Sequence, residues 1–415
     1  MGLLAKIKKY KWIVKVFFSG SFKDIKKTIQ GFRHEKDFYY VKETHVDMKE
    51  LLKCALCPNM CRFECPSLRV THKEMYAPAT KSRISYHMER KNLDMTDLHT
   101  AEVAYMCTNC DGCRNWCPMD ISTGDLLTQV RADLINREIY IPGVKEFDAR
   151  VMEKQTAFEQ DTFTQIEDLN VNMENPEVFY YTGCVMAEKK PAAVKANIKI
   201  LQKAGIRFCM YADERTCCGG PLHTLGLLNS AKYFAEKNIA LFNKAGAKII
   251  VTDCPACTNS IRNTYKTLGC KHNYKVYTSV EFYRKLLEEG KIKPEKSVPL
   301  SITYHDPCIS SRGKMGTIDI ENARFIFSLI PDLDFREVYL HGDITQCCGR
   351  GGVSHVHHPE ISDAIGKQRV AQLKETGAEY IVSACPACEE GFMFNDGDPV
   401  LDIGEILAKS LADHA

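Results

Sequence analysis

The sequence lacks a dominant charge of either sign. In 415 residues, 55 Lys and Arg stand against 53 Asp and Glu, which gives a formal net charge of +2. This balance excludes a globally basic nucleic-acid-binding protein and a strongly acidic disordered chain, so we expect no nucleic-acid partner. The remaining composition, with 45% hydrophobic and 26% charged residues, is that of an ordinary globular protein of two or three domains.

Long hydrophobic runs are also missing. The longest apolar stretch near the start, Trp12 to Phe18, is interrupted by Lys15 and is much shorter than the ~20 residues that a membrane span requires. No hydrophobic segment is followed by a small-residue cleavage site, so we expect no signal peptide. The expected compartment is a reducing cytoplasm, where clustered thiols bind metals or carry out redox chemistry.

Cysteine, in contrast, is abundant, with 20 residues. In a small secreted chain this number would indicate disulfide bonds, but a chain of this length has enough core-forming residues to fold without them. The spacing of the cysteines must therefore indicate what they do.

The first 45 residues form a basic N-terminal arm. Residues 1–36 contain ten Lys or Arg but only two acidic residues, Asp24 and Glu35. Apolar residues recur at helical spacing on one face: Leu3, Ile7, Tyr10, Val14 and Phe17. Such a basic amphipathic helix can lie on an anionic membrane surface, dock on a partner subunit, or pack on its own domain. We therefore expect a cytoplasmic protein that could be peripheral to the membrane.

A four-cysteine run ends at Cys117–Pro118 with the spacing C-x2-C-x2-C-x3-C-P. This is the spacing of a ferredoxin-type [4Fe–4S] site, whose fourth cysteine reaches the neighbouring cluster in two-cluster proteins. Zinc sites more often use two separated C-x2-C pairs. The run predicts iron–sulfur ligands at Cys107, Cys110, Cys113 and Cys117.

A second run precedes it and has one residue more, C-x2-C-x3-C-x3-C-P, at Cys54, Cys57, Cys61 and Cys65. The simplest assignment gives Cys54, Cys57, Cys61 and Cys117 to one cubane cluster. The other cubane then takes Cys65, Cys107, Cys110 and Cys113. We expect a mostly helical two-cluster ferredoxin-like domain at 46–140, followed by a linker at 141–175.

The last 240 residues contain an internal repeat. The sequence Cys-Pro-Ala-Cys occurs at 254–257 and again at 385–388, and a double cysteine occurs at 217–218 and again at 347–348. Strand-like and helix-like stretches alternate in each half, which predicts two parallel α/β domains at 176–297 and 298–415. The strands are expected at 178–181, 248–252, 300–304 and 380–382. Because function collects beyond the carboxyl ends of such strands, the cysteines that follow them are candidate site residues.

The repeated pattern of each half contains five cysteines rather than four. Five thiols that include an adjacent pair are too many for a tetrahedral zinc ion or a simple cubane cluster. The first set is Cys184, Cys217, Cys218, Cys254 and Cys257, and the second is Cys308, Cys347, Cys348, Cys385 and Cys388.

This pattern resembles the cysteine-rich CCG domain. Its tandem form, fused to a two-cluster ferredoxin domain, is similar to the D-type catalytic subunit of heterodisulfide reductases of anaerobic metabolism and methanogenesis. The resemblance implies that each five-cysteine set holds a noncubane [4Fe–4S] cluster, in addition to the two cubane clusters. It also implies that the noncubane clusters flank a disulfide, such as that of coenzyme M and coenzyme B, and each capture one sulfur.

The implied partner is a membrane cytochrome b subunit or a flavoprotein. The architecture also resembles the electron-relay iron–sulfur subunits of glycolate, lactate and glycerol-3-phosphate dehydrogenases, in which the CCG cysteines are often incomplete. Retention of all ten cysteines favours disulfide reduction by the chain itself. A structural zinc protein is a third alternative, and the five-cysteine sets argue against it.

Several other residues invite a functional interpretation. His305 could deliver a proton to a released thiolate, but a hydrogen-bonded core histidine is the commoner outcome. Surface positions are expected for His341, His355, His357 and His358. A solvated face is expected for Arg312, Lys314 and Arg350, with substrate binding as the alternative. Buried structural thiols are expected at Cys209 and Cys270.

Overall fold

The computed structural model describes residues 38–158, 164–211, 214 and 216–412, together with Ser19, Ser21, Ile25 and Lys26. The chain divides into two compact units, Met1–Thr44 and His45–Ala415, and the cysteines all belong to the second. The amphipathic helix predicted in the N-terminal arm lies outside the described residues. No helix of the described residues is long and apolar enough to cross a membrane.

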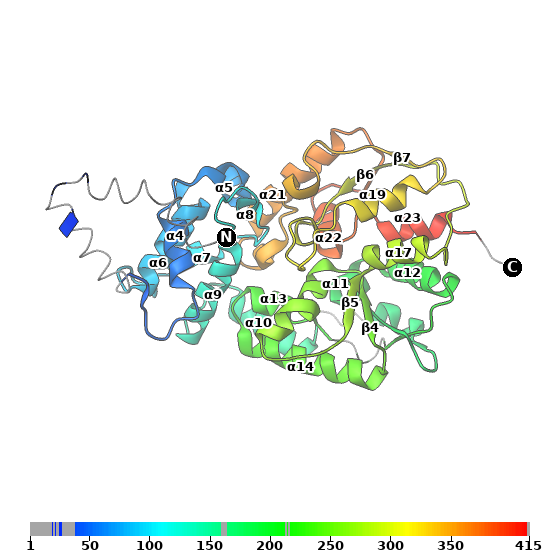
Figure 1. Cartoon of the computed structure of the whole chain (residues 1–415), viewed down its shortest axis with the longest axis horizontal. Helices are drawn as coiled ribbons and strands as arrows, with labels where there is room; N and C mark the ends of the chain where they lie inside the picture. The colour runs from blue at the N-terminus through cyan, green and yellow to red at the C-terminus, as the bar shows by residue number, and fades with distance from the viewer. Residues whose placement is uncertain are drawn as a thin grey trace. The chain divides into compact units, whose positions relative to one another are not determined.

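The second unit begins with helices, which are blue and cyan in Figure 1. The side chain of Asp47 caps the start of the helix that ends with Cys54 and Ala55. Ser122 caps the start of the helix that follows Cys117. The first cysteine run thus begins at the end of one helix, and the second run stops before the start of another. The α-helices are α4 (Met48–Ala55), α5 (Pro66–Thr71), α6 (Pro78–Glu89), α7 (Leu98–Tyr105), α8 (Gly112–Asn115) and α9 (Thr123–Asn136). Two 3-10 helices, Met60–Glu64 and Glu74–Tyr76, complete this part.

The segment expected to be a linker contains helix α10 (Val144–Lys154) and a 3-10 helix, Thr164–Leu169. Val144, Phe147 and Val151 are buried on one face of α10. The backbone carbonyl of Gln155, just after this helix, accepts a hydrogen bond from Cys217 N–H. The segment therefore packs against the body of the protein and does more than connect two domains.

The first repeat contains a five-stranded sheet in the order β1-β3-β2-β4-β5. The short β1 pairs antiparallel with β3, and the other pairs are parallel. Its strands are β1 (Val171–Asn172), β2 (Val178–Tyr181), β3 (Phe208–Met210), β4 (Ile249–Thr252) and β5 (Lys275–Thr278). Its helices are α11 (Cys184–Lys189), α12 (Pro191–Lys203), α13 (Gly220–Thr224), α14 (Leu228–Ala245), α15 (Pro255–Asn259), the π-helix Ser260–Thr264, α16 (Tyr265–Thr267) and α17 (Ser279–Glu288).

The second repeat contains a four-stranded parallel sheet in the order β7-β6-β8-β9. Its strands are β6 (Ser301–His305), β7 (Asp334–Phe335), β8 (Tyr380–Ser383) and β9 (Val400–Asp402). Its helices are α18 (Cys308–Ser311), α19 (Glu321–Ser328), the 3-10 helices Gly342–Ile344 and Gly351–Val353, α20 (Ser354–His357), α21 (Pro359–Lys374), α22 (Pro386–Phe394) and α23 (Ile403–Ser410). The predicted α/β fold is confirmed.

The two sheets share one plan. All four residues of β2 are buried, as expected of a parallel strand covered on both faces, and only Ser301 of β6 is partly exposed. The last residue of β2, Tyr181, pairs with Thr252, and the last residue of β6, His305, pairs with Ser383. The paired residue lies two positions before a cysteine in both cases, so both sheets deliver cysteines at their carboxyl edges.

Helices from the two repeats pack against one another in a reciprocal way. The helix that starts at Cys184, α11, contacts α22, and α15 contacts the helix that starts at Cys308, α18. Each helix that carries the first cysteine of one repeat therefore lies on the helix of the Cys-Pro-Ala-Cys motif of the other. Helices α12 and α23 add a larger contact, which Figure 1 shows at the far end from the N-terminal helices.

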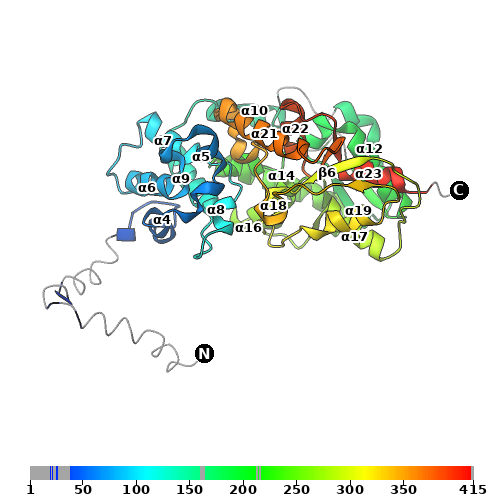
Figure 2. The same cartoon turned by 90° about the horizontal axis from the view of Figure 1, so that it is seen from above.

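The helical part rests on the second repeat close to the cysteines. Helix α21 packs against α5, as both Figure 1 and Figure 2 show. Gly352, with φ +67°, approaches so closely that a Cβ atom there would lie 2.2 Å from the carbonyl oxygen of Cys107. Gly351 is similarly close to Thr108. The glycines after the second double cysteine therefore permit a close approach of two backbones.

Candidate metal centres

Five cysteines of the helical part line one pocket: Cys54, Cys57, Cys61, Cys113 and Cys117. Thr123 also lines it, and its hydroxyl lies 3.6 Å from the Cys54 sulfur. Burial, followed by the neighbouring Cys54 and Cys57, raises the pKa of Cys61 to about 12. A thiol in this position does not ionise readily by itself, but metal coordination deprotonates it. Four of these five cysteines are those predicted to share the first cubane cluster, and the fifth, Cys113, is predicted to belong to the other one.

A second group gathers around a buried lysine. Lys81 is only 2% exposed, and its Nζ donates hydrogen bonds to the Cys65 sulfur at 3.5 Å and to the Met106 carbonyl oxygen at 2.8 Å. Burial alone would lower the pKa of Lys81, but the neighbouring Cys65, Cys107 and Cys113 raise it. The structure therefore brings Cys65 close to Cys107 and Cys113 of the other run, with which it is predicted to share a cubane cluster.

Cys110 lies where the helical part meets the second repeat. Its thiol hydrogen-bonds with Cys347 of the double cysteine. Its carbonyl oxygen accepts a hydrogen bond of 2.8 Å from Arg312 Nη1. Cys110, Cys347 and Ile365 form a small buried cluster against which Cys308 packs. A predicted cubane ligand and a predicted noncubane ligand are thus direct neighbours.

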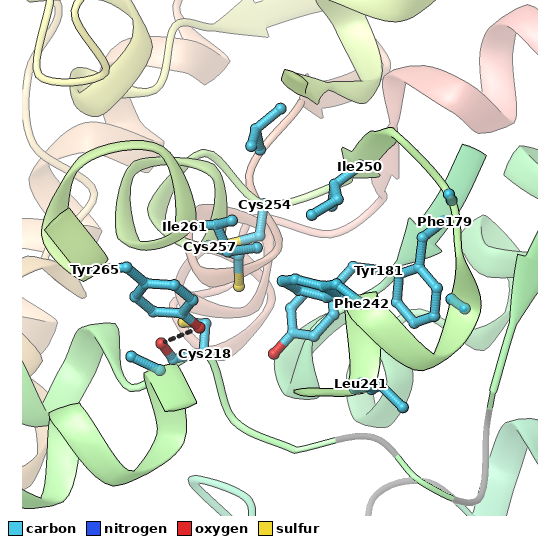
Figure 3. Packing of buried hydrophobic residues seen from close by; sticks show 14 of the residues in the cluster. Phe179, Tyr181, Cys218, Leu241, Phe242, Ile250, Cys254, Cys257, Ile261 and Tyr265 are labelled. Atoms are coloured by element: carbon cyan, nitrogen blue, oxygen red, sulfur yellow. Dashed lines mark hydrogen bonds between the residues drawn. The ribbon is translucent and has the colours of Figure 1, made fainter. Parts of the chain in front are cut away.

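The first five-cysteine set forms a continuous series of thiol contacts. Hydrogen bonds join Cys184 to Cys217, Cys217 to Cys218, Cys218 to Cys257, and Cys257 to Cys254. All five thiols are buried. In Figure 3, Cys218, Cys254 and Cys257 lie between the rings of Tyr265 and Tyr181. The hydrogen bonds that Cys218 receives hold its pKa well below the usual range, whereas those of Cys217 raise its pKa.

The second set repeats this arrangement. Cys347 contacts Cys348, Cys348 contacts Cys388, and Cys388 contacts Cys385. Cys308 is half-buried and lies near Cys110 and Cys348. In both repeats the glycine after the double cysteine donates its N–H to a thiol: Gly219 to Cys217 at 3.4 Å and Gly349 to Cys347 at 3.3 Å.

The two sets meet at the interface between the repeats, because the thiols of Cys254 and Cys385 are hydrogen-bonded to each other. Each of these cysteines is the first of its Cys-Pro-Ala-Cys motif and follows a central strand of its sheet. The reciprocal packing of α11 on α22 and of α15 on α18 brings the carboxyl edges of the two sheets together.

The donor sets fit iron–sulfur clusters. Buried thiolates that receive backbone N–H bonds are the usual environment of such clusters, and soft sulfur ligands select zinc or iron–sulfur rather than hard cations. Five cysteines in each set exceed the four that tetrahedral zinc accepts. All 20 cysteines are unbridged by disulfides.

The core interpretation of His305 is confirmed. The residue is 1% exposed, and its Nδ1 accepts a hydrogen bond of 3.1 Å from Arg369 Nε. A ring nitrogen of His305 and the sulfurs of Cys348 and Cys388 lie within 4.8 Å of one another. Burial lowers the pKa of His305. A histidine therefore stands directly behind the second cysteine set.

The expected solvated face at Arg312, Lys314 and Arg350 is wrong. All three side chains are largely buried, and each meets a partner inside the protein. Arg312 Nε donates to the Asp343 carbonyl oxygen at 2.8 Å, Lys314 Nζ lies 3.3 Å from Asp111, and Arg350 Nε lies 2.8 Å from Glu390. Arg312 and Lys314 thereby tie the second repeat to the helical part.

Some of the other expectations can also be decided. His357 is buried, with Nε2 3.1 Å from the Gly352 carbonyl oxygen, so its expected surface position is wrong. Cys209 and Cys270 are buried in the core of the first repeat, as predicted. Burial raises the pKa of Cys209 to about 11, which is consistent with an inert structural thiol.

Four buried cations escaped the sequence interpretation: Lys81, Arg131, Lys190 and Arg369. Arg131 donates to the carbonyl oxygens of Ala104, Cys107 and Thr224 and so joins the helical part to the first repeat. Arg369 lies on the same helix face as Ser362, Gly366 and Leu373, all buried. The sequence signal for Arg369 was its place on a helix face of small and apolar residues. Periodicity in one sequence does not distinguish such a buried arginine from an exposed one.

Comparison with known families supports this organisation. Residues 50–121 match the 4Fe-4S dicluster domain, and residues 178–262 and 302–392 match the CCG cysteine-rich domain. The chain carries a 4Fe-4S dicluster domain followed by two CCG domains. It is an iron–sulfur oxidoreductase subunit related to the D-type subunits of heterodisulfide reductases.

Curated relatives cover most of this tandem-CCG chain. The D-type subunit of the heterodisulfide reductase of Methanosarcina barkeri is 28% identical over 89% of this chain and 96% of its own length. The B-type subunit of the fumarate reductase (CoM/CoB) of Methanothermobacter marburgensis is 27% identical over 84% of this chain and 68% of its own. The EtfAB:quinone oxidoreductase of Syntrophomonas wolfei is 28% identical over 76% of this chain and 47% of its own.

A solved structure shares the fold. A hypothetical protein from Helicobacter pylori superposes with a TM-score of 0.50 at 12% identity, over 95% of this chain and 77% of its own. This similarity concerns the architecture alone.

Proposed function

We propose that this chain reduces a small-molecule disulfide at its two five-cysteine sets, each of which holds a noncubane [4Fe–4S] cluster. The observation that carries the proposal is the direct contact between Cys254 and Cys385, which joins two complete sets across the interface of the repeats. A disulfide has two sulfur atoms to be captured. Two facing sets of thiolate ligands match that requirement.

The chemistry balances as follows. Reduction of R–S–S–R′ to RSH and R′SH breaks one S–S bond and consumes two electrons and two protons. When bound, each cluster supplies one electron and an iron site for one emerging thiolate. The protein holds the two sets in register through the packing of α11 on α22 and of α15 on α18. Burial of the cysteines keeps water away from the site.

Electrons enter, in this proposal, at the cubane cluster of Cys54, Cys57, Cys61 and Cys117. Apart from Cys54, these ligands are only half-buried. Large apolar side chains are exposed beside them: Leu56, Met60, Phe63, Trp116 and Met119. Such a surface suits a redox partner that must bring its own cofactor close. The contact of Cys110 with Cys347 would link the residues that hold the inner cubane cluster to those of the second repeat.

The finer identities are part of the same proposal. The disulfide is the coenzyme M–coenzyme B heterodisulfide or a similar one, because the relatives include D-type subunits of heterodisulfide reductases. The electron donor is a membrane cytochrome b subunit or a flavoprotein. Contact of the N-terminal arm with a membrane surface, at the cytoplasmic side, stays a prediction.

A second candidate function is electron relay without disulfide chemistry. The similarity to an EtfAB:quinone oxidoreductase favours it, because that name describes electron transfer from a flavoprotein to a quinone. In this case the chain would serve a flavin-dependent dehydrogenase of the glycolate, lactate or glycerol-3-phosphate kind. Complete cysteine sets in both repeats are the observation against it.

The test begins with anaerobic purification and iron analysis. Four [4Fe–4S] clusters predict roughly sixteen irons per chain. The oxidised protein is then studied by electron paramagnetic resonance with coenzyme M, coenzyme B, glutathione or no thiol. We expect a new signal only with a thiol that belongs to the substrate disulfide. About eight irons and no response to any thiol would contradict disulfide reduction.

A turnover assay separates the two candidates. Reduced viologen replaces the unknown donor, and the thiols released from each disulfide are counted. Disulfide reduction predicts two thiols per two electrons, whereas a relay protein consumes no disulfide. Cys209→Ala is the control variant for this assay, because Cys209 is a buried thiol of the first repeat that belongs to neither set.

A further inference from the structure

The two repeats place different residues behind their cysteine sets. Tyr181 and His305 occupy the same position: each ends a central strand, lies three residues before the first cysteine, and pairs with the residue two before the Cys-Pro-Ala-Cys motif. A tyrosine in the first repeat is thus replaced by a histidine in the second.

A second exchange accompanies the first. Gly219 approaches the carbonyl oxygen of Ala231, and Gly349 approaches that of Ser362, which aligns the helices α14 and α21. In this alignment Asn238 corresponds to Arg369. The neutral pair of tyrosine and asparagine in the first repeat is replaced by histidine and arginine in the second.

Arg369 determines which nitrogen of His305 carries the proton. An arginine side chain can only donate, so His305 Nδ1, at 3.1 Å from Arg369 Nε, accepts. The ring proton of the neutral histidine therefore lies on Nε2, which is the nitrogen left to donate to a thiolate. A ring nitrogen of His305 and the Cys348 sulfur lie within 4.8 Å of each other, and the two side chains share a hydrogen bond.

The first repeat directs its equivalent groups elsewhere. The hydroxyl of Tyr181 donates to the backbone carbonyl oxygen of Thr216. The amide of Asn238 donates to the carbonyl oxygens of Cys217 and Phe234, at 2.9 and 2.8 Å. Both side chains thus satisfy backbone groups, and neither brings a positive charge to the thiolates.

We propose that His305, oriented by Arg369, donates a hydrogen bond to the Cys348 sulfur and makes the cluster of the second repeat easier to reduce than that of the first. Hydrogen bonds to cluster sulfurs and nearby positive charge both stabilise the reduced, more negative state. The second repeat also contacts Cys110 of the dicluster domain. The cluster of the second repeat is therefore the first of the pair to receive an electron.

This inference rests on the proposed cluster occupancy, and a potentiometric titration followed by paramagnetic resonance tests it. In the wild-type protein we expect the two noncubane clusters to titrate at different potentials. Cys257→Ser and Cys388→Ser, which each alter one ligand set, assign the two signals. His305→Phe should shift only the second-repeat signal to lower potential, and His305→Gln, which keeps an N–H donor, should restore most of the shift.

Tyr181→Phe is the matched control, because its lost hydroxyl faces a carbonyl oxygen and not a thiol. We expect both potentials to stay unchanged in this variant. Equal wild-type potentials, or a shift of neither signal in His305→Phe with all irons retained, would overturn the inference. Fewer than about sixteen irons in the wild-type protein would instead contradict the cluster occupancy itself.

A second measurement uses the wild-type protein alone. Wild-type protein labelled with ¹⁵N-histidine is partly reduced, and nitrogen hyperfine coupling is recorded on the noncubane signal that appears first. Coupling to a histidine nitrogen on that signal, and not on the later one, is expected from the proposal. Coupling on neither signal, or on the later one alone, refutes it.

Discussion

The two CCG repeats have the same sheet order and the same five-cysteine pattern, yet they surround their cysteines differently. Tyr181 and Asn238 stand behind the first set, and His305 and Arg369 stand behind the second. The difference extends to the position four residues after the first cysteine, where the first repeat has Glu188 and the second has Arg312. One scaffold thus supplies two electrostatic environments.

The comparison teaches that the two repeats share their cysteine pattern while the surrounding charges differ. A cation buried beside thiolates lowers the free energy of their anionic form, whereas a tyrosine hydroxyl bonded to a carbonyl does not. The second repeat also carries the contacts with Cys107 and Cys110 of the dicluster domain. In the proposed function, its position next to the dicluster domain and its cationic surroundings both favour reduction of the second repeat's cluster before that of the first.

The largest expected effect is common to both repeats. Cys254→Ser and Cys385→Ser should each abolish disulfide turnover, with a loss of at least about 100-fold, because changes to groups that merely support metal ligands already cost about 10–100-fold. Thiol release with reduced viologen measures it. Retention of activity in one variant only would show that the two repeats do not act as a pair.

A smaller effect on the rate of electron transfer is expected at Arg312, where the first repeat has Glu188 instead. Arg312→Gln removes the donor to the carbonyl oxygens of Cys110, Asp343 and Thr345, which loosens the second repeat from the dicluster domain. We expect electron transfer into the second-repeat cluster to slow by about tenfold, as small displacements in a positioned site do. Freeze-quench resonance after mixing with a reductant measures it.

Glu188→Gln is the corresponding change in the first repeat. Its side chain is near Lys189, at 3.6 Å, in the same repeat. We expect electron transfer into the second-repeat cluster to keep its rate in this variant. Equal slowing in both variants would contradict the preferred route through the second repeat.

The glycines after the double cysteines offer a stability comparison. Gly219→Ala and Gly349→Ala both place a Cβ on a left-handed residue, which costs about 1–2 kcal/mol. At Gly349 the added atom would also lie 2.2 Å from the Ser362 carbonyl oxygen, against 3.0 Å from the Ala231 oxygen at Gly219. We therefore expect a larger drop in melting temperature for Gly349→Ala. Anaerobic thermal unfolding of the iron-loaded protein tests this order, and the reverse order would contradict it.

The smallest effect concerns Cys270, a cysteine of the first repeat outside both sets. Cys270→Ala should retain all irons and lose about 1 kcal/mol or less, because this thiol acts as a small apolar side chain. Iron analysis and thermal unfolding check both points. A lost cluster would mean that the first repeat uses a sixth cysteine.

Much of the fold could be predicted from local patterns. The strands at 178–181 and 380–383 and the helix at 359–374 follow from runs of apolar residues and from Pro359. The predicted linker at 141–175 nevertheless contains α10, because three apolar residues at helical spacing suffice when a neighbouring surface covers them. Local periodicity does not reveal such a surface.

The candidate site divides in the same way. Cysteine spacing predicted a shared site for Cys54, Cys57, Cys61 and Cys117, and the structure brings these four to one pocket together with Cys113. The interior positions of Arg312 and Lys314 could not be predicted, because their acceptors, the Cys110 carbonyl oxygen and Asp111, belong to a distant part of the chain. A charged residue enters the interior only where such partners satisfy it.

The amino-acid sequence by itself determined the grouping of the cysteines by spacing, the duplicated α/β plan and the places of Cys184, Cys254, Cys308 and Cys385 after strands, since all three depend on local spacing. Only the tertiary structure decided that Cys254 meets Cys385, that Cys110 meets Cys347, and that His305 accepts a hydrogen bond from Arg369. The physical reason is that contacts between distant segments arise from helix packing across the repeats. The spacing of residues along the chain does not predict that packing.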